Sequence, residues 1–289
     1  MSVSADLTDR GTRARVEGLY VHPLKSAGAI PVDVLELDER GATGDRRWLL
    51  VDKEGVGITA RERHRLALIR PSFAEADRNG KLRLDAPGFS TCDVRVPTNP
   101  STRSVRIWID DVPAHDAGDM VAEWCSDAVG AWCRMVYLAE SARRPLQAKY
   151  AGSLPHAHRQ VAFSDGAPLL LLGTASIDAL NVRLREQGSD AVSYRRFRSN
   201  VLLADSTAYE EDTWREVTIG DVTIGVGSQC PRCVMTTVNP DTAEGGVEPL
   251  RTLAQYRRDD SGVVFGMNAT HAAAGSIRLG DRVTVTALR

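Results

Sequence analysis

Lysine is scarce in this sequence, and long apolar runs are absent. Only four of its 289 residues are lysine, and arginine supplies the remaining 32 of the 36 basic side chains. The longest apolar run, Pro168–Gly173, is too short to cross a bilayer, and the polar segment Met1–Arg15 has no apolar secretory core. The formal net charge of −2 argues against a broadly basic surface, so we expect no nucleic-acid partner and no membrane partner. The net charge does not exclude a local positive site.

Cysteine occurs in an odd number, and three common active-site motifs are missing. Five cysteines without a secretory signal predict reduced thiols in a cytoplasmic protein rather than a disulfide framework. The phosphate-binding loops GxGxxG and GxxxxGK(S/T) do not occur, and neither does the GxSxG of serine hydrolases. We therefore expect neither a doubly wound nucleotide-binding fold nor a Ser-His-Asp hydrolase.

Short β-prone runs separated by Gly, Pro, Asp and Asn occupy much of the chain. In the first half, the expected strands are Val16–Val21, Val32–Leu37, Trp48–Val51, Leu66–Ile69, Leu82–Leu84, Val105–Ile109 and Arg134–Leu138. In the second half, they are Val201–Ala204, the hairpin of Glu216–Ile219 with Val222–Val226, and a final hairpin of Ser276–Leu279 with Val283–Ala287. This spacing is typical of a barrel or a sandwich.

Three segments predict helices. Apolar residues between Val121 and Trp132 recur on one helical face, and a second helix is expected from Thr174, as N-cap, to Gly188. A short third helix is expected at Glu248-Pro249. The irregular segment 140–168 separates two strand-rich halves, so the length suggests two domains with a boundary near 140. The expected fold class is mixed α/β, mainly β, with three helices.

The pair Cys230-Pro231-Arg232-Cys233 is the sharpest local motif, and its chemistry is open on the residues alone. It could be half of a zinc site, a redox dithiol, a single thiolate for a soft metal, or two ordinary buried cysteines at a turn. No second CxxC exists, which disfavours zinc. The β-prone residues that follow disfavour a helix dipole at the pair, and Arg232 could help to hold a thiolate ionised.

Several basic side chains stand in loops that suit an anionic ligand. Lys25 is next to Ser26 in a turn between two strands, although a lysine there is by itself more often solvated. Arginines cluster at Arg46-Arg47, at 61–65 and at 195–198, a pattern that fits a small, multiply anionic ligand. We expect Arg63 and Arg65 to be surface residues that pair with acidic side chains. His156 and His158 have no third metal ligand at motif spacing, so we interpret them as part of a loop.

Taken together, these stretches resemble the MOSC-domain proteins that carry an N-terminal MOSC β-barrel domain, a family that includes the mitochondrial amidoxime-reducing component and the C-terminal domain of molybdenum cofactor sulfurase. The supporting stretches are His22–Ser26, Asp45–Trp48, Thr59–Arg61, Phe163–Asp165, Phe197–Asn200, Cys230–Thr242 and Phe265–Asn268. The resemblance spans about residues 15–288. Residues 1–13 are expected to be a disordered lead-in, and the resemblance implies an N-terminal β-rich domain at 14–139 and a MOSC β-barrel domain at 140–289.

The resemblance also implies a molybdenum cofactor, molybdenum bound to molybdopterin, and assigns residues to it. Cys233 corresponds to the catalytic thiolate that ligates molybdenum, and Cys230 to a position that is not a ligand. The matching cofactor-binding positions are Lys25, Ser26, Arg46, Gly166, Ala167, Arg198, Asn200, Pro231, Arg232 and Asn268. Gly166-Ala167 stands where amidoxime-reducing members have Thr-Ser, and Pro231 where they have Ser. Hydroxyl contacts are lost at these three positions, while backbone amides remain at the first two.

By the same resemblance we expect a molybdenum-dependent oxidoreductase that reduces N-hydroxylated small molecules such as amidoximes and hydroxylamines. No two-iron ferredoxin domain follows Arg289, so the electrons are expected from a separate ferredoxin, flavodoxin or flavin reductase. The family also carries a general association with pyridoxal phosphate binding. Two other hypotheses stay open: a cofactor or sulfur carrier without turnover, and a non-catalytic zinc or thiol module. We expect a monomer.

Overall fold

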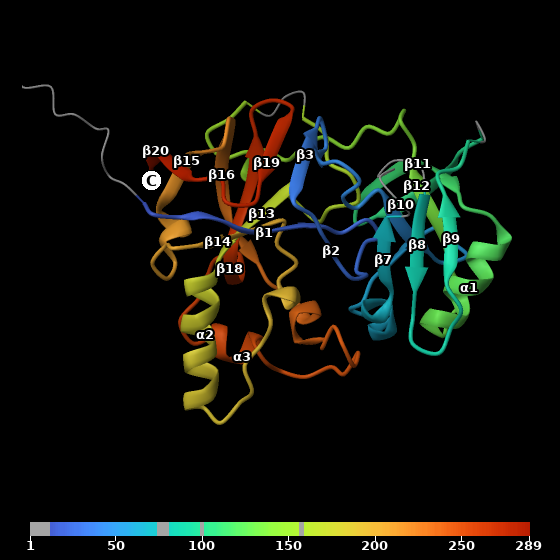
Figure 1. The fold of residues 1–289 in the computed structure, drawn as a ribbon. Coiled ribbons are helices and arrows are strands. Elements are labelled where there is room, and N and C mark those ends of the chain that lie inside the picture. The colour runs from blue at the N-terminus through green and yellow to red at the C-terminus, as the bar shows by residue number, and fades with distance from the viewer. Residues whose placement is uncertain (1–11, 74–80, 99–100, 156–158) are drawn as a thin grey trace, which may run out of the picture.

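The computed structural model describes residues 12–73, 81–98, 101–155 and 159–289. The predicted lead-in lies outside these ranges except for its last two residues, and so do His156 and His158. Strands make up more of the described chain than helices do, and it has three α-helices (Figure 1), which confirms the predicted fold class.

The largest sheet has nine strands and joins both ends of the chain. In pairing order its strands are β2 (Ile30–Pro31), β1 (Arg15–Val21), β14 (Val201–Ala204), β13 (Leu169–Gly173), β18 (Gly262–His271), β16 (Val222–Pro231), β15 (Trp214–Ile219) and β20 (Val283–Leu288), and β17 (Arg258–Asp259) pairs with β18 outside that path. All these pairs are antiparallel except β13 with β14, which α2 (Thr174–Glu186) connects. A core that includes Leu19, Leu171 and Trp214 fills the inner face.

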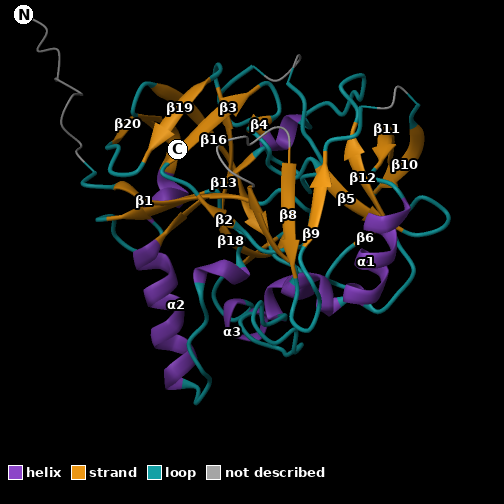
Figure 2. Ribbon diagram, turned by 45° about the vertical axis from the view of Figure 1, so that its right-hand side comes forward, coloured by secondary structure: helices purple, strands orange, loops and turns teal. Residues whose placement is uncertain are grey.

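Three smaller sheets complete the structure. The first contains β10 (Arg103–Ile107), β11 (Asp110–Asp116), β12 (Arg134–Leu138), β5 (Trp48–Val51) and β6 (Gly57–Ile58). The second contains β19 (Gly275–Arg278), β3 (Val34–Asp38) and β4 (Gly41–Ala42), and the third β7 (Arg70–Phe73), β8 (Lys81–Asp85) and β9 (Cys92–Arg95). The helix α1 (Asp119–Val129) packs beside β9 and β12, far from α2 and α3 (Leu250–Leu253), as Figure 2 shows.

Five short 3-10 turns connect these elements: His64–Leu68, Ala148–Tyr150, Tyr194–Arg196, Glu210–Thr213 and Val234–Thr237. The first corrects a prediction, because Leu66–Ile69 was expected to be a strand. Leu66 and Ile69 are fully buried, and a short buried turn has the same apolar composition as a short strand. The last turn begins directly after Cys233, although its residues are β-prone.

The predicted C-terminal hairpin is also wrong. Instead of pairing with each other, β19 pairs with β3 and β20 pairs with β15. The amides of Gly280 and Val283 donate to the carbonyls of Val16 and Ala14, so the start of β1 occupies the place of a hairpin partner. The N-terminal strands therefore complete the sheet of the C-terminal half, and the predicted domain boundary at 139/140 stays a prediction.

Two predicted helix ends differ as well. The N-cap of α2 is Gly173 rather than Thr174, because the buried Glu211 carboxylate accepts the Gly173 amide. The helix α1 ends at Val129, since Gly130 takes a left-handed conformation, and Trp132 is left exposed. Among the described residues, no helix is long and apolar enough to span a membrane.

Arg144 fastens the loop between β12 and β13 to the first half of the chain. Its side chain is buried, donates from Nε to the Asp110 carboxylate at 2.7 Å, and donates from Nη1 to the carbonyls of Ala162 and Ser164. The loop then runs on to the next residues, 165–167, which line a cleft.

We predict that Arg144→Ala lowers the free energy of unfolding by about 3 kcal/mol, because it leaves two carbonyls and a half-buried carboxylate without their donor. Urea unfolding followed by circular dichroism measures the change. Arg144→Lys keeps the charge but not the several N–H donors of the guanidinium, and it is expected to lose less of the free energy of unfolding. A loss below about 1 kcal/mol for the alanine variant would contradict this account of the loop.

Candidate functional site

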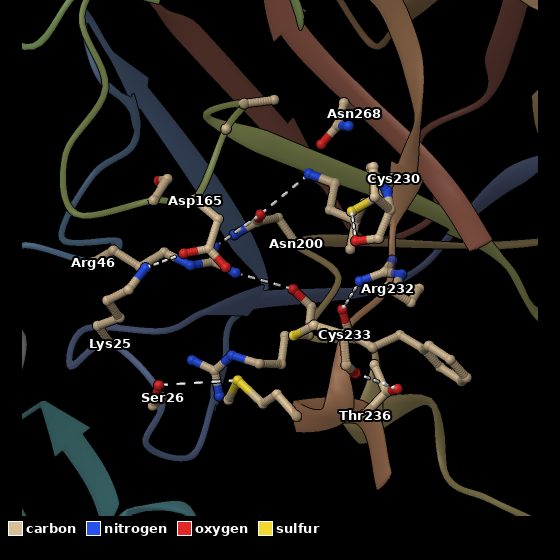
Figure 3. Close-up of a pocket in the computed structure, with 18 of the residues that line it drawn as sticks. Lys25, Ser26, Arg46, Asp165, Asn200, Cys230, Arg232, Cys233, Thr236 and Asn268 are labelled. Atoms are coloured by element: carbon tan, nitrogen blue, oxygen red, sulfur yellow. Dashed lines mark hydrogen bonds and ion pairs between the residues drawn. The ribbon is translucent and has the colours of Figure 1, made fainter. Parts of the chain in front are cut away.

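A cleft lies where loops from both halves of the chain meet (Figure 3). Its walls come from the loop after β1, the turn before β5, the segment after β6, the loops before β13 and β14, and the end of β16. The pairing of β16 with β18 shifts register twice near that end, and such bulges commonly redirect side chains beside sites.

All the site residues that the sequence predicts line this one cleft: Lys25, Ser26, Arg46, Gly166, Ala167, Arg198, Asn200, Pro231, Arg232, Cys233 and Asn268. Lys25, Arg46 and Asp165 lie on one side of it, and Cys230, Arg232 and Cys233 on the other (Figure 3). Residues up to 243 positions apart in the sequence are therefore brought together. Their individual roles stay predictions.

The thiol of Cys233 has a cationic partner that sequence reasoning missed. Arg61 Nε donates to Cys233 Sγ at 3.1 Å, and Arg61 Nη2 lies 3.5 Å from Asp165. Arg232 was expected to support the thiolate, but its guanidinium donates to the carbonyls of Phe265 and Phe197 at 2.7 and 3.0 Å. Arg232 thus anchors the cysteine segment to β18 and the loop before β14, and Arg61 contacts the sulfur.

Lys25 is buried, so the reading of a solvated loop lysine is wrong. Its ammonium donates to the Phe163 carbonyl at 2.7 Å and to the Asp165 carboxylate. Burial lowers the pKa of Lys25 to about 8, against the opposing charge of Asp165. Burial would raise the pKa of Asp165, but Lys25, Arg61 and Arg46 together hold it below its usual range. Asp165 was quoted in a motif but not predicted as a site residue.

Arg46 and Asn200 belong to one buried network. Arg46 donates to the Asp45 carboxylate, to Asn200 Oδ1 at 3.1 Å and to the Arg198 carbonyl at 3.1 Å. Asn200 also accepts the Leu170 amide and donates to Tyr20 and Asp45. The Asn200 amide is saturated by protein groups, so this side chain positions Arg46 and joins β1 to β13.

Two guanidinium nitrogens in the site region, Arg198 Nη2 and Arg232 Nη2, are buried and have no partner among the residues that the structure describes. Burial, and then repulsion from Arg46, lowers the pKa of Arg198 to about 9. A buried donor without an acceptor costs free energy, so an orphaned guanidinium nitrogen at a cleft suits an anionic ligand. Ser26, Arg46 and Arg198 also have positive φ angles, a strained backbone that clusters at functional sites.

Gly166 and Cys230 also line the cleft, and each has its own neighbours. A Cβ at Gly166 would lie 2.5 Å from the Tyr150 ring, so a larger residue there requires the Tyr150 side chain to shift. Burial raises the pKa of Cys230, whose thiol has only a distant contact with the Pro231 carbonyl, at 3.7 Å. Both cysteines are free thiols. Within the described ranges, no three His, Cys, Asp or Glu side chains gather as ligands for one metal ion.

Comparison with known proteins identifies both halves of the chain. Residues 13–131 match the family described as MOSC N-terminal beta barrel domain, and residues 158–284 match the MOSC domain. Mitochondrial amidoxime reducing component 2 of Rattus norvegicus is 32% identical over 288 residues, covering 93% of this chain and 82% of the relative. Mitochondrial amidoxime-reducing component 1 is 32% identical in Xenopus laevis and 31% in Homo sapiens, with 93% of this chain covered by each. The alignments cover 81% and 82% of those relatives.

The scarcity of lysine makes Lys25 directly observable. We predict that NMR of the cofactor-free chain with ¹³C-labelled lysine shows one signal that titrates near pH 8 and disappears in Lys25→Met. Between pH 8 and the ordinary value of 10.5, the folded chain binds fewer protons at Lys25 than the unfolded chain does. The stability of the wild type relative to Lys25→Met therefore rises with pH across that window. A midpoint near 10.5 would contradict the burial of a charged Lys25.

Proposed function

The chain belongs to the family of MOSC-domain proteins that includes the amidoxime-reducing components, and from that membership we propose that it is a molybdenum-cofactor-dependent oxidoreductase that reduces N-hydroxylated small molecules. The observation that carries the proposal is a cysteine thiol in a cleft with several buried cationic groups. Two guanidinium nitrogens of these groups have no partner among the described residues. A soft metal prefers a thiolate, and a pterin phosphate prefers Lys and Arg donors.

The residues of the cleft fit such a cofactor. Cys233 is the candidate ligand, and Arg198 and Lys25 are the candidate partners of an anionic group. Arg198 donates from Nη1 to the Ala27 carbonyl, which fixes the guanidinium and leaves Nη2 free to bind. Gly166 and Ala167 offer backbone amides at the same cleft. When bound, the cofactor supplies the two-electron chemistry that removes the oxygen of an N–OH group.

The protein's own part is to hold Cys233 in place and to orient it toward the cleft. The Arg232 amide donates to the Val263 carbonyl at 2.6 Å, and Thr236 Oγ1 donates to the Cys233 carbonyl at 3.0 Å, so the backbone on both sides of the sulfur is fixed. Asn268 donates to Ser228 and Gln229, which stiffens the bulged end of β16. These bonds place Cys233 without using the sulfur, which stays available as a ligand.

The reaction takes two electrons and two protons for each N–OH group reduced and releases water. We propose that a separate redox protein of the ferredoxin, flavodoxin or flavin reductase type supplies the electrons. We also propose a cytoplasmic setting, which the five free thiols support, because disulfides rarely form there.

We predict that Cys233→Ala lowers molybdenum content and dye-linked reduction of a benzamidoxime by more than about 100-fold, because it removes the candidate ligand. Cys230→Ala is the matched control and keeps both. Metal analysis and pterin fluorescence after release measure loading separately from turnover. Equal molybdenum in wild type and Cys233→Ala would contradict the ligand assignment. Full loading without reduction by any donor would instead favour a cofactor or sulfur carrier.

A further inference from the structure

Trp108 has a backbone conformation that its own side chain disfavours. It is the first of two residues in the turn between β10 and β11, which the Ile107–Asp110 pair closes. Its φ is +58°, in the left-handed region where such hairpin turns usually have glycine or asparagine. A bulky residue there is strained and persists only where the surroundings demand it.

The indole of Trp108 lies against two cationic side chains of the cleft. Arg61 Cζ is 4.3 Å from the ring centroid, and Lys25 Nζ is 5.7 Å from it. The residue is 43% exposed, so it does not serve to fill a core. Tryptophan is the ring that attracts a cation most strongly, and arginine stacks flat on such a face.

Arg61 is the residue whose orientation this contact controls. Its backbone amide donates to Thr59 Oγ1, its Nε donates to Cys233 Sγ at 3.1 Å, and its Nη2 faces Asp165. A guanidinium held against an indole loses rotational freedom, which keeps its N–H groups directed at the sulfur and the carboxylate. Without the ring, this quarter-exposed arginine side chain would regain rotamer freedom.

We propose that Trp108 is a positioning residue that clamps Arg61 onto the sulfur of Cys233. The inference rests on the proposed function, in which Cys233 ligates molybdenum. An N–H···S bond withdraws electron density from a thiolate ligand and thereby raises the reduction potential of the metal that the thiolate binds. Trp108 thus acts on the metal through its contact with Arg61.

The test compares Trp108→Gly and Trp108→Asn, which relieve the strained φ and remove the ring, with Trp108→Phe, which keeps a ring. In cofactor-free protein, NMR is expected to show a slowly exchanging Arg61 Nε–H signal in wild type and Trp108→Phe. Its loss in Arg61→Lys assigns it. The signal is expected to disappear in the two ringless variants, while their unfolding midpoints stay equal to wild type or rise, because the strain is gone.

In loaded protein, the ringless variants are expected to lower the molybdenum midpoint potential, read by redox titration with electron paramagnetic resonance. They are also expected to lower kcat by about 10–100-fold with little change in KM. Trp108→Gly should add nothing in an Arg61→Lys background, since both changes remove the same bond.

Two outcomes overturn the proposal and one outcome separates it from the proposed function. An unchanged Arg61 signal in the ringless variants, or an unchanged potential in loaded protein, refutes the clamp while the oxidoreductase assignment stands. Wild-type protein that takes up no molybdenum refutes the proposed function and the effect on potential, and the Arg61 signal then still decides whether Trp108 holds Arg61.

Discussion

Like charges have to be held together at the cleft, and the rest of the site depends on how the fold achieves this. Lys25, Arg46, Arg198 and Arg232 converge there, yet many of their donors go to backbone carbonyls rather than to carboxylates. A carbonyl satisfies an N–H without cancelling its charge. The cleft therefore keeps a positive potential in a protein whose net charge is −2, and the carboxylates of Asp45 and Asp165 only moderate it.

The carbonyls that hold these cations come from both halves of the chain. This explains why the N-terminal strands complete the sheet of the C-terminal half. The Arg46 guanidinium reaches the Arg198 carbonyl, and the Arg198 guanidinium reaches the Ala27 carbonyl, so each half supplies an acceptor for the other. Pairing of β1 with β14 brings these segments into register. The strained φ angles of Ser26, Arg46 and Arg198 show that local preference yields to this reciprocal bonding.

Periodicity predicts the parts of this fold that local contacts decide. Trp48–Val51 and Arg134–Leu138 have the predicted bounds because each is a short apolar strand between clear turn signals. The C-terminal hairpin fails because β19 pairs with β3, some 240 residues away, and β20 pairs with β15, 64 to 74 residues away. Family resemblance led to Cys233 and Lys25. It did not lead to Arg61 as the partner of Cys233, 172 positions distant, or to the positive φ of Trp108, since neither leaves a local pattern.

The closing contacts between residues 14–16 and 280–283 also set an order of events during synthesis. Lys25 and Arg46 leave the ribosome early, but Asn268 and the strands that complete the sheet are made last. Contacts of such long sequence separation form late, because the loop-closure entropy must be overcome first. A nascent chain therefore has its basic loops before it has the strands that complete the cleft, so an anionic ligand finds its full set of donors only once the last strands are in place.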